Sequence, residues 1–396
     1  MNFVLIADAF LPMKTSGAVQ IRDLVNEIAA QDHKITVLLP DSSLRNPWQL
    51  EQPAEKITVL RLKALPTKDI SYFRRAIGEH LLSFFMYRNL KKSPLKDTKW
   101  DAIIWYSPTT FFGPLVSKIK AQSNCRAYLI LRDIFPEWAV DMGLLKKGMI
   151  YRYFKGVERN QYEQADVIGV QTPSNLDYFA SEHSTLKARI EVLNNWLAEA
   201  NPETSSVQVS ETSLAGRKIF VYTGNIGIAQ GMEILIELAA KMQKDENVGF
   251  IFVGRGTAVE QIQKQVAELD LDNVLFFDEI NPNEIPSLLE QCHVGLIALD
   301  PRHRNDNIPG KFLAYMQSGL PVLASINAGN DLENTINEKK VGEVVTSNDL
   351  AALYTKANQL LKNIEVDPEF NMRSKELAGD QFSASSAVRQ IVKALE

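Results

Sequence analysis

The chain has 396 residues, of which 45% are apolar and 23% charged, and its formal net charge is −5. This length favours two domains, and the acidic balance argues against a dedicated nucleic-acid binder. Two distant cysteines and five scattered histidines offer no metal-ligand spacing, so we expect no metal site. The sequence begins without a basic leader and has no run of about 18 apolar residues, which predicts a cytoplasmic protein.

Short apolar runs alternate with helical patterns along the first half of the chain. The runs that predict strands are 3–7, 34–40, 57–62, 100–106, 127–133, 166–172 and 189–195. Helical patterns such as 18–31 lie between them. This alternation predicts parallel strands joined by right-handed crossovers.

A polar stretch, NPETSSVQVSETSLAG (201–216), is interpreted as a domain linker. The alternation restarts after it, with strands expected at 218–224, 248–254, 273–279, 294–299, 321–325 and 341–345. We therefore predict an α/β protein of two Rossmann-like, doubly wound parallel-sheet domains that face each other across a cleft. Their expected bounds are 1–198 and 199–382, and the last helix, within 383–396, should pack back on the first domain.

In such sheets, ligands bind at the carboxyl ends of the strands, so the loops there are the candidate sites. The first of them carries Ser16 and Gly17, where a missing side chain would let a ligand approach the backbone. A plain turn explains this loop equally well. No GxGxxG fingerprint is present, which disfavours a dinucleotide cofactor.

Three loops of the second half combine glycines with cations. YTGNIGIAQGME (222–233) presents Gly224 and Gly227 before a helix, a pattern that favours an anion-binding nest of backbone N–H groups. VGRGTAVE (253–260) places Arg255 beside Gly256, and IPGKFLAYMQSGLPVLAS (308–325) places Pro309 and Lys311 at a helix start. Singly, each is explained by tight turns and solvated cations. Together they predict one site for a diphosphate ligand, most simply a nucleotide.

The first half contributes RDIFPEWAVDMG (132–143) at the end of a strand. Asp133 and Glu137 lie near Pro136 and aromatic residues, where they could bind sugar hydroxyls or act on a proton. The alternative is a capping aspartate in an ordinary loop.

Two basic segments rich in aromatic residues, 72–92 and 144–162, carry apolar side chains at helical spacing. On an acidic protein, such local basic clusters suit the anionic surface of a membrane. The alternative is a pair of ordinary amphipathic helices that pack on their own domain.

The sequence resembles glycosyltransferase family 4, the retaining, metal-independent GT-B enzymes that use nucleotide sugars. It is most similar to the bacterial O-antigen and capsule branch, which includes transferases of N-acetyl-L-fucosamine. The resemblance covers nearly the whole chain. It is carried by SGAVQIRDLVNEIAAQDHKITVLLP, RDIFPEW, EQADVIGVQTPSN, VLNNW, YTGNIGIAQGME, VGRG and IPGKFLAYMQSGLPVLAS.

The resemblance implies roles for several of these residues. Gly17 would lie against the donor diphosphate, and Arg255 with the Gly224–Gly227 loop would contact the nucleotide and its phosphates. Lys311 would neutralise the diphosphate, and Asp133 would face the sugar or the acceptor.

The chain departs from the family pattern in two places. Asn225 and Gln230 stand where many members have an arginine and a lysine. Asp306 and Ala314 stand where the family has paired glutamates, so the second glutamate is missing. These departures put more of the charge neutralisation on Arg255 and Lys311.

The resemblance implies transfer of a sugar from a UDP-linked donor to a lipid-diphosphate-linked saccharide, with no cofactor besides the nucleotide-sugar co-substrate. The enzyme would work in surface-polysaccharide synthesis, peripherally bound to the inner face of a bacterial plasma membrane. The donor would bind the second domain and the acceptor the first. Two alternatives stay open: a UDP-sugar 2-epimerase of the same fold, and a non-catalytic polysaccharide-assembly protein.

Overall fold

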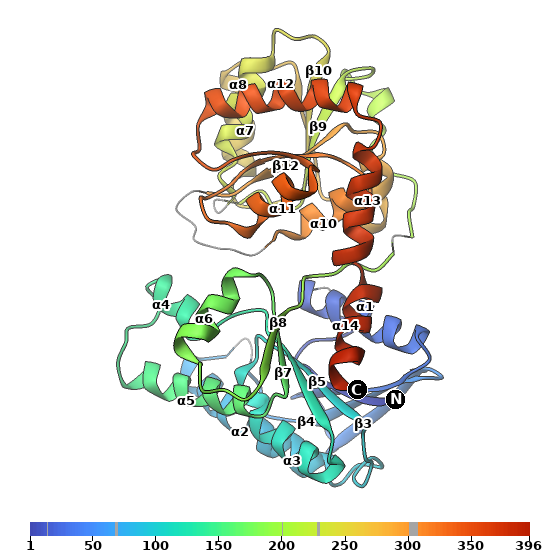
Figure 1. Ribbon diagram of the computed structural model, residues 1–396, viewed down its shortest axis with the longest axis vertical. Coiled ribbons are helices and arrows are strands. Elements are labelled where there is room, and N and C mark those ends of the chain that lie inside the picture. Colours follow the sequence, from blue (N-terminus) through green and yellow to red (C-terminus); the bar gives the residue numbers. More distant parts are fainter. Residues whose placement is uncertain (14, 68–69, 200, 228–229, 301–307) are drawn as a thin grey trace. The chain divides into compact units, whose positions relative to one another are not determined.

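The structure is a computed structural model that describes residues 1–13, 15–67, 70–199, 201–227, 230–300 and 308–396 (Figure 1). The chain divides into two compact units: Met1–Asn194 with Ala384–Glu396, and Asn195–Ser383. We call them unit 1 and unit 2. The chain therefore changes unit at Asn194, slightly before the expected position 198.

The polar stretch at 201–216 is not a linker, because it packs into unit 2. Val207, Val209 and Leu214 are all buried in the core of that unit, and the N–H of Val209 donates to Oε1 of Gln291 at 2.9 Å. These apolar residues anchor the stretch together with hydrogen bonds such as that from the N–H of Ser206 to Oε2 of Glu284 at 2.6 Å. Because serine, threonine and glutamate are abundant in this stretch, its composition did not indicate that Val207, Val209 and Leu214 are buried.

Unit 1 contains an eight-stranded sheet in the order β3-β4-β2-β1-β5-β6-β7-β8. Its strands are β1 Asn2–Ile6, β2 Lys34–Asp41, β3 Trp48–Ala54, β4 Ile57–Lys63, β5 Ala102–Tyr106, β6 Arg126–Ile130, β7 Val167–Val170 and β8 Arg189–Val192. The sheet is parallel apart from β3, which pairs antiparallel with β4 at the edge. The sequence analysis missed β3 because its polar residues and Pro53 are untypical of a buried strand, and an edge position tolerates both.

The helices of unit 1 are α1 Ser16–Ala30, α2 Tyr72–Leu90, α3 Gly113–Ser123, α4 Glu137–Asp141, α5 Met149–Glu163, α6 Ser174–Glu182 and α14 Ala384–Leu395. The C-terminal helix α14 lies beside α1 (Figure 1). Its Val388 and Ile391 are buried, and Nε2 of Gln390 donates to the backbone oxygen of Val192 at 2.8 Å. The apolar stripe of α14 therefore closes unit 1 against its sheet.

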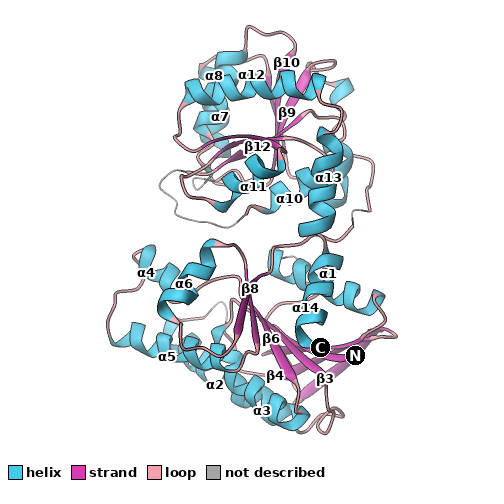
Figure 2. Cartoon of the chain, in the orientation of Figure 1, coloured by secondary structure: helices cyan, strands magenta, loops and turns pink. Residues whose placement is uncertain are grey.

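Unit 2 contains a parallel sheet in the order β11-β10-β9-β12-β13-β14. Figure 2 shows strands of this sheet in magenta, with β9, β10 and β12 labelled. Its strands are β9 Lys218–Thr223, β10 Val248–Val253, β11 Val274–Phe277, β12 Val294–Ala298, β13 Val322–Ser325 and β14 Gly342–Val345. Its helices are α7 Glu233–Met242, α8 Val259–Glu268, α9 Ile285–Leu289, α10 Gly310–Gln317, α11 Asp331–Lys339, α12 Leu350–Val366 and α13 Phe370–Gln381.

Successive side chains of a strand point to opposite faces, so each strand of unit 2 serves two cores. Ile219 and Val221 of β9 pack on the face covered by α9, α10, α11 and α13. Phe220 and Tyr222 pack on the other face, with α7, α8 and α12. Two layers of helices around a parallel sheet leave the loops at the strand ends to carry ligands. The α/β class and the parallel sheets predicted from the sequence are confirmed.

Candidate functional site

Two glycine loops of unit 2, 224–227 after β9 and 254–256 after β10, pack directly on each other. The N–H of Gly224 donates to the oxygen of Val253, and that of Ile226 to the oxygen of Arg255, both at 2.9 Å. Gly254 has φ +152°, and a Cβ there would collide with the carbonyl of Gly224. Gly256 has φ +159°, and a Cβ there would likewise collide with the carbonyl of Ile226. Both positions therefore require glycine.

This packing corrects the expectation of an open nest of N–H groups. The N–H of Gly224 is paired with β10, and the N–H of Gly227 donates to Oε1 of Gln230 at 3.0 Å. The same oxygen accepts from Nδ2 of Asn225 at 3.0 Å. Asn225, Gly227 and Gln230 do come together. They are joined by two hydrogen bonds to Oε1 of Gln230, which stabilise the loop. Gly256 likewise has a packing role in the structure.

Lys311 lies in the first turn of α10, after Pro309 in extended conformation. A Cβ on Gly224 would lie 4.0 Å from Cε of Lys311, so the structure brings these two predicted residues together. Nζ of Lys311 lies 3.2 Å from the ring centroid of Tyr222. Desolvation lowers the pKa of Lys311 well below its ordinary value. No carboxylate of the described ranges forms an ion pair with it.

Arg255 is more exposed than Lys311, and it has a partner that the sequence analysis missed. Its Nε lies 2.9 Å from Oε2 of Glu279, which follows β11 in the same row of strand ends. Both side chains are mostly exposed. Glu279 is the last residue of the predicted strand 273–279. Because ligands bind at the carboxyl ends of such strands, its position in the sequence already made it a candidate. Asp306 lies outside the described residues.

In unit 1, Ser16 and Gly17 belong to the helix rather than to the loop before it. Helix α1 begins at Ser16, and Oγ1 of Thr15 caps it by accepting from the N–H of Ala18 at 3.4 Å. A Cβ on Gly17 would lie at an ordinary contact distance of 3.6 Å from Cε1 of Tyr106. Neither contact by itself demands glycine at position 17.

Asp133 and Glu137, the two candidate carboxylates of unit 1, lie in different surroundings. Desolvation raises the pKa of Asp133, while the neighbouring Arg132 guanidinium opposes that shift. Oε1 of Glu137, at the start of α4, accepts from the Tyr151 hydroxyl at 2.9 Å and lies 3.0 Å from Nζ of Lys155. The carboxylate of Glu137 is thus engaged in an ion pair, and the role in sugar binding or proton transfer expected for it stays a prediction.

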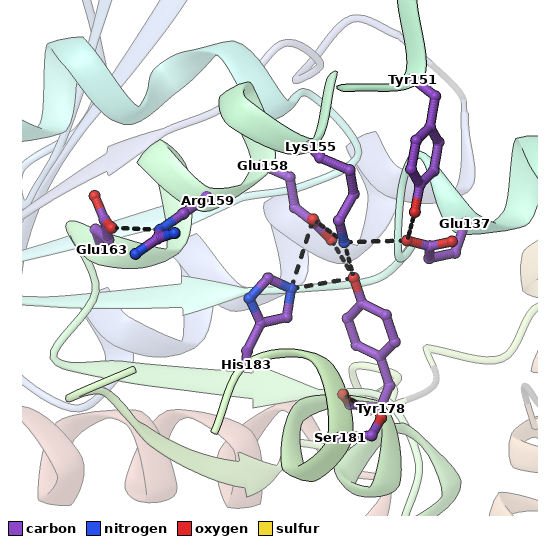
Figure 3. Close-up of polar contacts among 9 residues, drawn as sticks. All are labelled: Glu137, Tyr151, Lys155, Glu158, Arg159, Glu163, Tyr178, Ser181 and His183. Carbon is purple, nitrogen blue, oxygen red and sulfur yellow. Dashed lines mark hydrogen bonds and ion pairs between the residues drawn. The ribbon is translucent and has the colours of Figure 1, made fainter. Parts of the chain in front are cut away.

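Glu137 belongs to a polar network that links α4, α5 and α6 (Figure 3). Lys155 Nζ lies 2.5 Å from Oε2 of the fully buried Glu158 and donates to Oη of Tyr178 at 2.7 Å. The Tyr178 hydroxyl donates to Glu158 Oε1 at 2.5 Å, and Nε2 of His183 lies 3.2 Å from that hydroxyl. Sequence analysis missed this network, because only tertiary structure brings its two helices and the end of α6 together.

The two basic segments are also only partly exposed. In 72–92, the second half of α2 packs inward, with Leu82, Met86 and Leu90 buried. Nζ of Lys91 donates to the backbone oxygen of Lys96 at 3.0 Å and lies 3.8 Å from Asp97. The later half of 72–92 therefore offers a narrower exposed face than the sequence suggested, and membrane contact through this segment stays a prediction. Its first two turns and the segment 144–162 expose apolar side chains.

Residues 207–376 match the family described as glycosyl transferases group 1. The putative colanic acid biosynthesis glycosyl transferase WcaI of Escherichia coli K12 is 23% identical, with 93% of each chain covered. The probable glycosyltransferase WbjE of Pseudomonas aeruginosa is 26% identical, and the match spans 57% of either chain. The protein is a glycosyltransferase. A third relative is the O-antigen chain mannosyltransferase C of Escherichia coli, which is 21% identical, with 77% of each chain covered.

Solved structures show the fold of this glycosyltransferase. Sucrose-phosphate synthase from Thermosynechococcus elongatus superposes with a TM-score of 0.71 at 15% identity, covering 99% of this chain and 98% of the other. WaaG, a glycosyltransferase involved in lipopolysaccharide biosynthesis, gives 0.64 at 15% identity and covers 99% of each chain. Anabaena HepE in complex with UDP and glucose gives 0.66 at 15% identity, covering 100% and 99%. The predicted GT-B fold is thereby confirmed.

Proposed function

We propose that this glycosyltransferase takes its sugar from a UDP-linked donor held by the loops of unit 2. The observation that carries the proposal is Lys311, a partly buried cation with a lowered pKa and no ion pair with a described carboxylate. A buried charge without a partner is costly, so a ligand that brings negative charge accounts for its position. A diphosphate meets this requirement, and HepE, which has the same fold, was solved with UDP.

The chemistry follows from where the charge develops. When the bond between the anomeric carbon and the phosphate oxygen breaks, the nucleoside diphosphate leaves with the electron pair. The acceptor hydroxyl forms the new bond and gives up its proton. Lys311 and the N-terminus of α10 would stabilise the departing diphosphate without a metal. Retention at the anomeric carbon follows from the resemblance to family 4.

The acceptor side of the proposal rests on unit 1. Asp133 follows β6 and has a raised pKa, which suits a carboxyl that meets sugar hydroxyls or a proton in transfer. The names of WcaI and of the mannosyltransferase support an acceptor in surface-polysaccharide synthesis. A lipid-diphosphate link on that acceptor is proposed from the sequence resemblance. N-acetyl-L-fucosamine is the sugar proposed from the sequence resemblance. Peripheral contact with the membrane is proposed from the same resemblance and from the two basic segments rich in aromatic residues. Among the described residues, we find no candidate transmembrane helix.

Replacing Lys311 by methionine tests the donor site. Wild-type protein should be stabilised against heat by UDP, because a ligand that binds only the folded state raises its stability. Lys311→Met should lose this shift, and its transfer activity should fall by roughly a hundredfold. Lys241→Met is the matched control, since Lys241 also lies over a tyrosine ring, that of Tyr354 at 4.8 Å. UDP stabilisation that survives in Lys311→Met would refute the proposed donor site.

The same preparation separates transfer from 2-epimerisation. Incubated with a UDP-sugar and no acceptor, a transferase should leave the sugar configuration unchanged, as judged by NMR of the recovered nucleotide sugar. An epimerase would release a changed UDP-sugar under these conditions.

A further inference from the structure

Unit 1 exposes an unusual group of large apolar side chains on α2, on α5 and on the connection from α4 to α5. Phe73 is 77% exposed, Leu144 71%, Met149 86% and Ile150 64%, and Met142 is also exposed. We call these five residues the apolar ridge. Single exposed apolar residues are common, but several together mark an interaction surface.

Side-chain contacts between α2, α4 and α5 join the parts of the ridge into one region. Nδ1 of His80 on α2 lies 2.8 Å from Oη of Tyr153 on α5. The ring of Phe135 contacts Trp138 on α4 and Phe154 on α5, with centroids 6.0 and 4.8 Å apart. Phe73 lies two helical turns before His80, and Met149 lies one turn before Tyr153, so both share the faces that these contacts bring together.

The network of Figure 3 keeps the ridge exposed. Lys155 ties α5 to Glu137 of α4 at 3.0 Å, and Tyr151 adds a second bond to the same carboxylate at 2.9 Å. Glu158, one turn further along α5, is fully buried against Tyr178 of α6. These contacts hold α5 in the orientation in which Met149 and Ile150 of its first turn are exposed.

Cations surround the ridge. The segment from Met142 to Arg152 contains Lys146, Lys147 and Arg152 and no acidic residue. All three cations are exposed, and none forms an ion pair with a described residue. Exposed apolar side chains interleaved with exposed cations match the boundary of an anionic bilayer, which accepts both the apolar groups and the charges.

We propose that the apolar ridge inserts into the headgroup boundary of an anionic phospholipid bilayer, with Lys146, Lys147 and Arg152 on the lipid phosphates. This deepens the proposed function, because it rests on an acceptor that is anchored in lipid. It assigns the contact to the α4–α5 connection and the first turns of α2. The cations at the end of segment 72–92, which the sequence analysis had included, are left out.

Vesicle sedimentation of the full chain tests the proposal. The protein should bind vesicles of phosphatidylcholine mixed with phosphatidylglycerol, and bind phosphatidylcholine alone at least about tenfold more weakly. The double variant Met149→Glu, Ile150→Glu should bind the anionic vesicles at least about tenfold more weakly than wild type. Val366→Glu, Met372→Glu is the matched control, since both residues are exposed apolar residues of unit 2. This control should bind as wild type does.

Trp138 supplies a second measurement, because it is 43% exposed and lies on α4 beside the ridge. Its fluorescence should be quenched by brominated acyl chains in wild type and in the control, and not in the ridge variant. Wild type that stays unbound, or a ridge variant that binds like the control, would overturn the proposal. UDP stabilisation measured without vesicles reports the donor site separately, so the two proposals can fail independently.

Discussion

Two buried or partly buried charges, Glu158 in unit 1 and Lys311 in unit 2, show how surroundings separate a structural residue from a candidate functional one. Glu158 is fully buried, but Lys155, Tyr178 and His183 surround its carboxylate. The ammonium group of Lys311 lies over the ring of Tyr222 and forms no ion pair with a described residue. Folding alone explains Glu158. For Lys311, the proposed donor diphosphate would supply the opposite charge.

The setting of Glu158 predicts a pH dependence of stability. Burial would raise the pKa of this carboxyl, but its hydrogen bonds to His183, Lys155 and Tyr178 outweigh burial and hold the pKa below the ordinary value of 4.5. A carboxyl whose pKa is lower in the folded protein stabilises the fold above its unfolded pKa. That contribution is lost as the pH falls through the folded pKa.

Glu158→Gln should therefore lower the free energy of unfolding by about 3 kcal/mol at pH 7, because Lys155 loses its buried partner. The difference from wild type should shrink as the pH is lowered below 4.5. Urea unfolding at several pH values measures both effects. Glu163→Gln is the control, since Glu163 pairs with Arg159 on the exposed side of the same helix. An equal loss at every pH would contradict the role assigned to the carboxylate.

At the scale of elements, the loops after β9 and β10 depend on each other for their conformation. Each glycine of the 254–256 loop holds a positive φ and faces the backbone of the 224–227 loop. The main chains of the two loops lie in contact. The 224–227 loop can therefore hold Gly224 beside Lys311 only while position 254 has no side chain. The glycines that looked like phosphate contacts in the sequence thus serve first to bring two strand ends together.

Gly254→Ala should therefore destabilise the protein by about 2 kcal/mol or more and also weaken UDP binding, because the new Cβ must displace the carbonyl of Gly224. Gly379→Ala is the matched control. Gly379 lies in α13 with nothing near its Cβ position, so alanine should leave stability unchanged or raise it slightly. Thermal unfolding with and without UDP measures both quantities. Normal stability and UDP binding in Gly254→Ala would show that the loops can separate.

At the scale of the whole molecule, the chain crosses between its units twice and ends in unit 1. The return segment α14 completes that unit, because Ala387, Val388 and Ile391 are buried beside α1. Unit 1 is therefore built from both ends of the sequence. Unit 2 is continuous and contains all the loops proposed to hold the donor.

Ile391→Ala should accordingly cost about 3 kcal/mol of stability by leaving a cavity in unit 1. Binding of UDP to unit 2 should survive at temperatures where the protein stays folded. Lys393→Ala, an exposed position on the same helix, should change neither property. Calorimetric unfolding and UDP titration distinguish these outcomes, and full stability in Ile391→Ala would show that α14 is dispensable.

The sequence by itself determined the α/β class, the parallel strands and the loops worth attention, because the alternation of apolar runs with helical patterns is a local property. It also singled out Lys311 and Gly224, whose proximity the structure shows. Tertiary structure alone decided the partners: Glu279 for Arg255, Lys155 for Glu137, and the packed glycine loops in place of an open nest. It also decided that the first turns of α2 expose Phe73 and Ile77, whereas Leu82, Met86 and Leu90 of the later turns are buried. Pairing and burial depend on residues brought together from distant parts of the chain, and no local pattern records them.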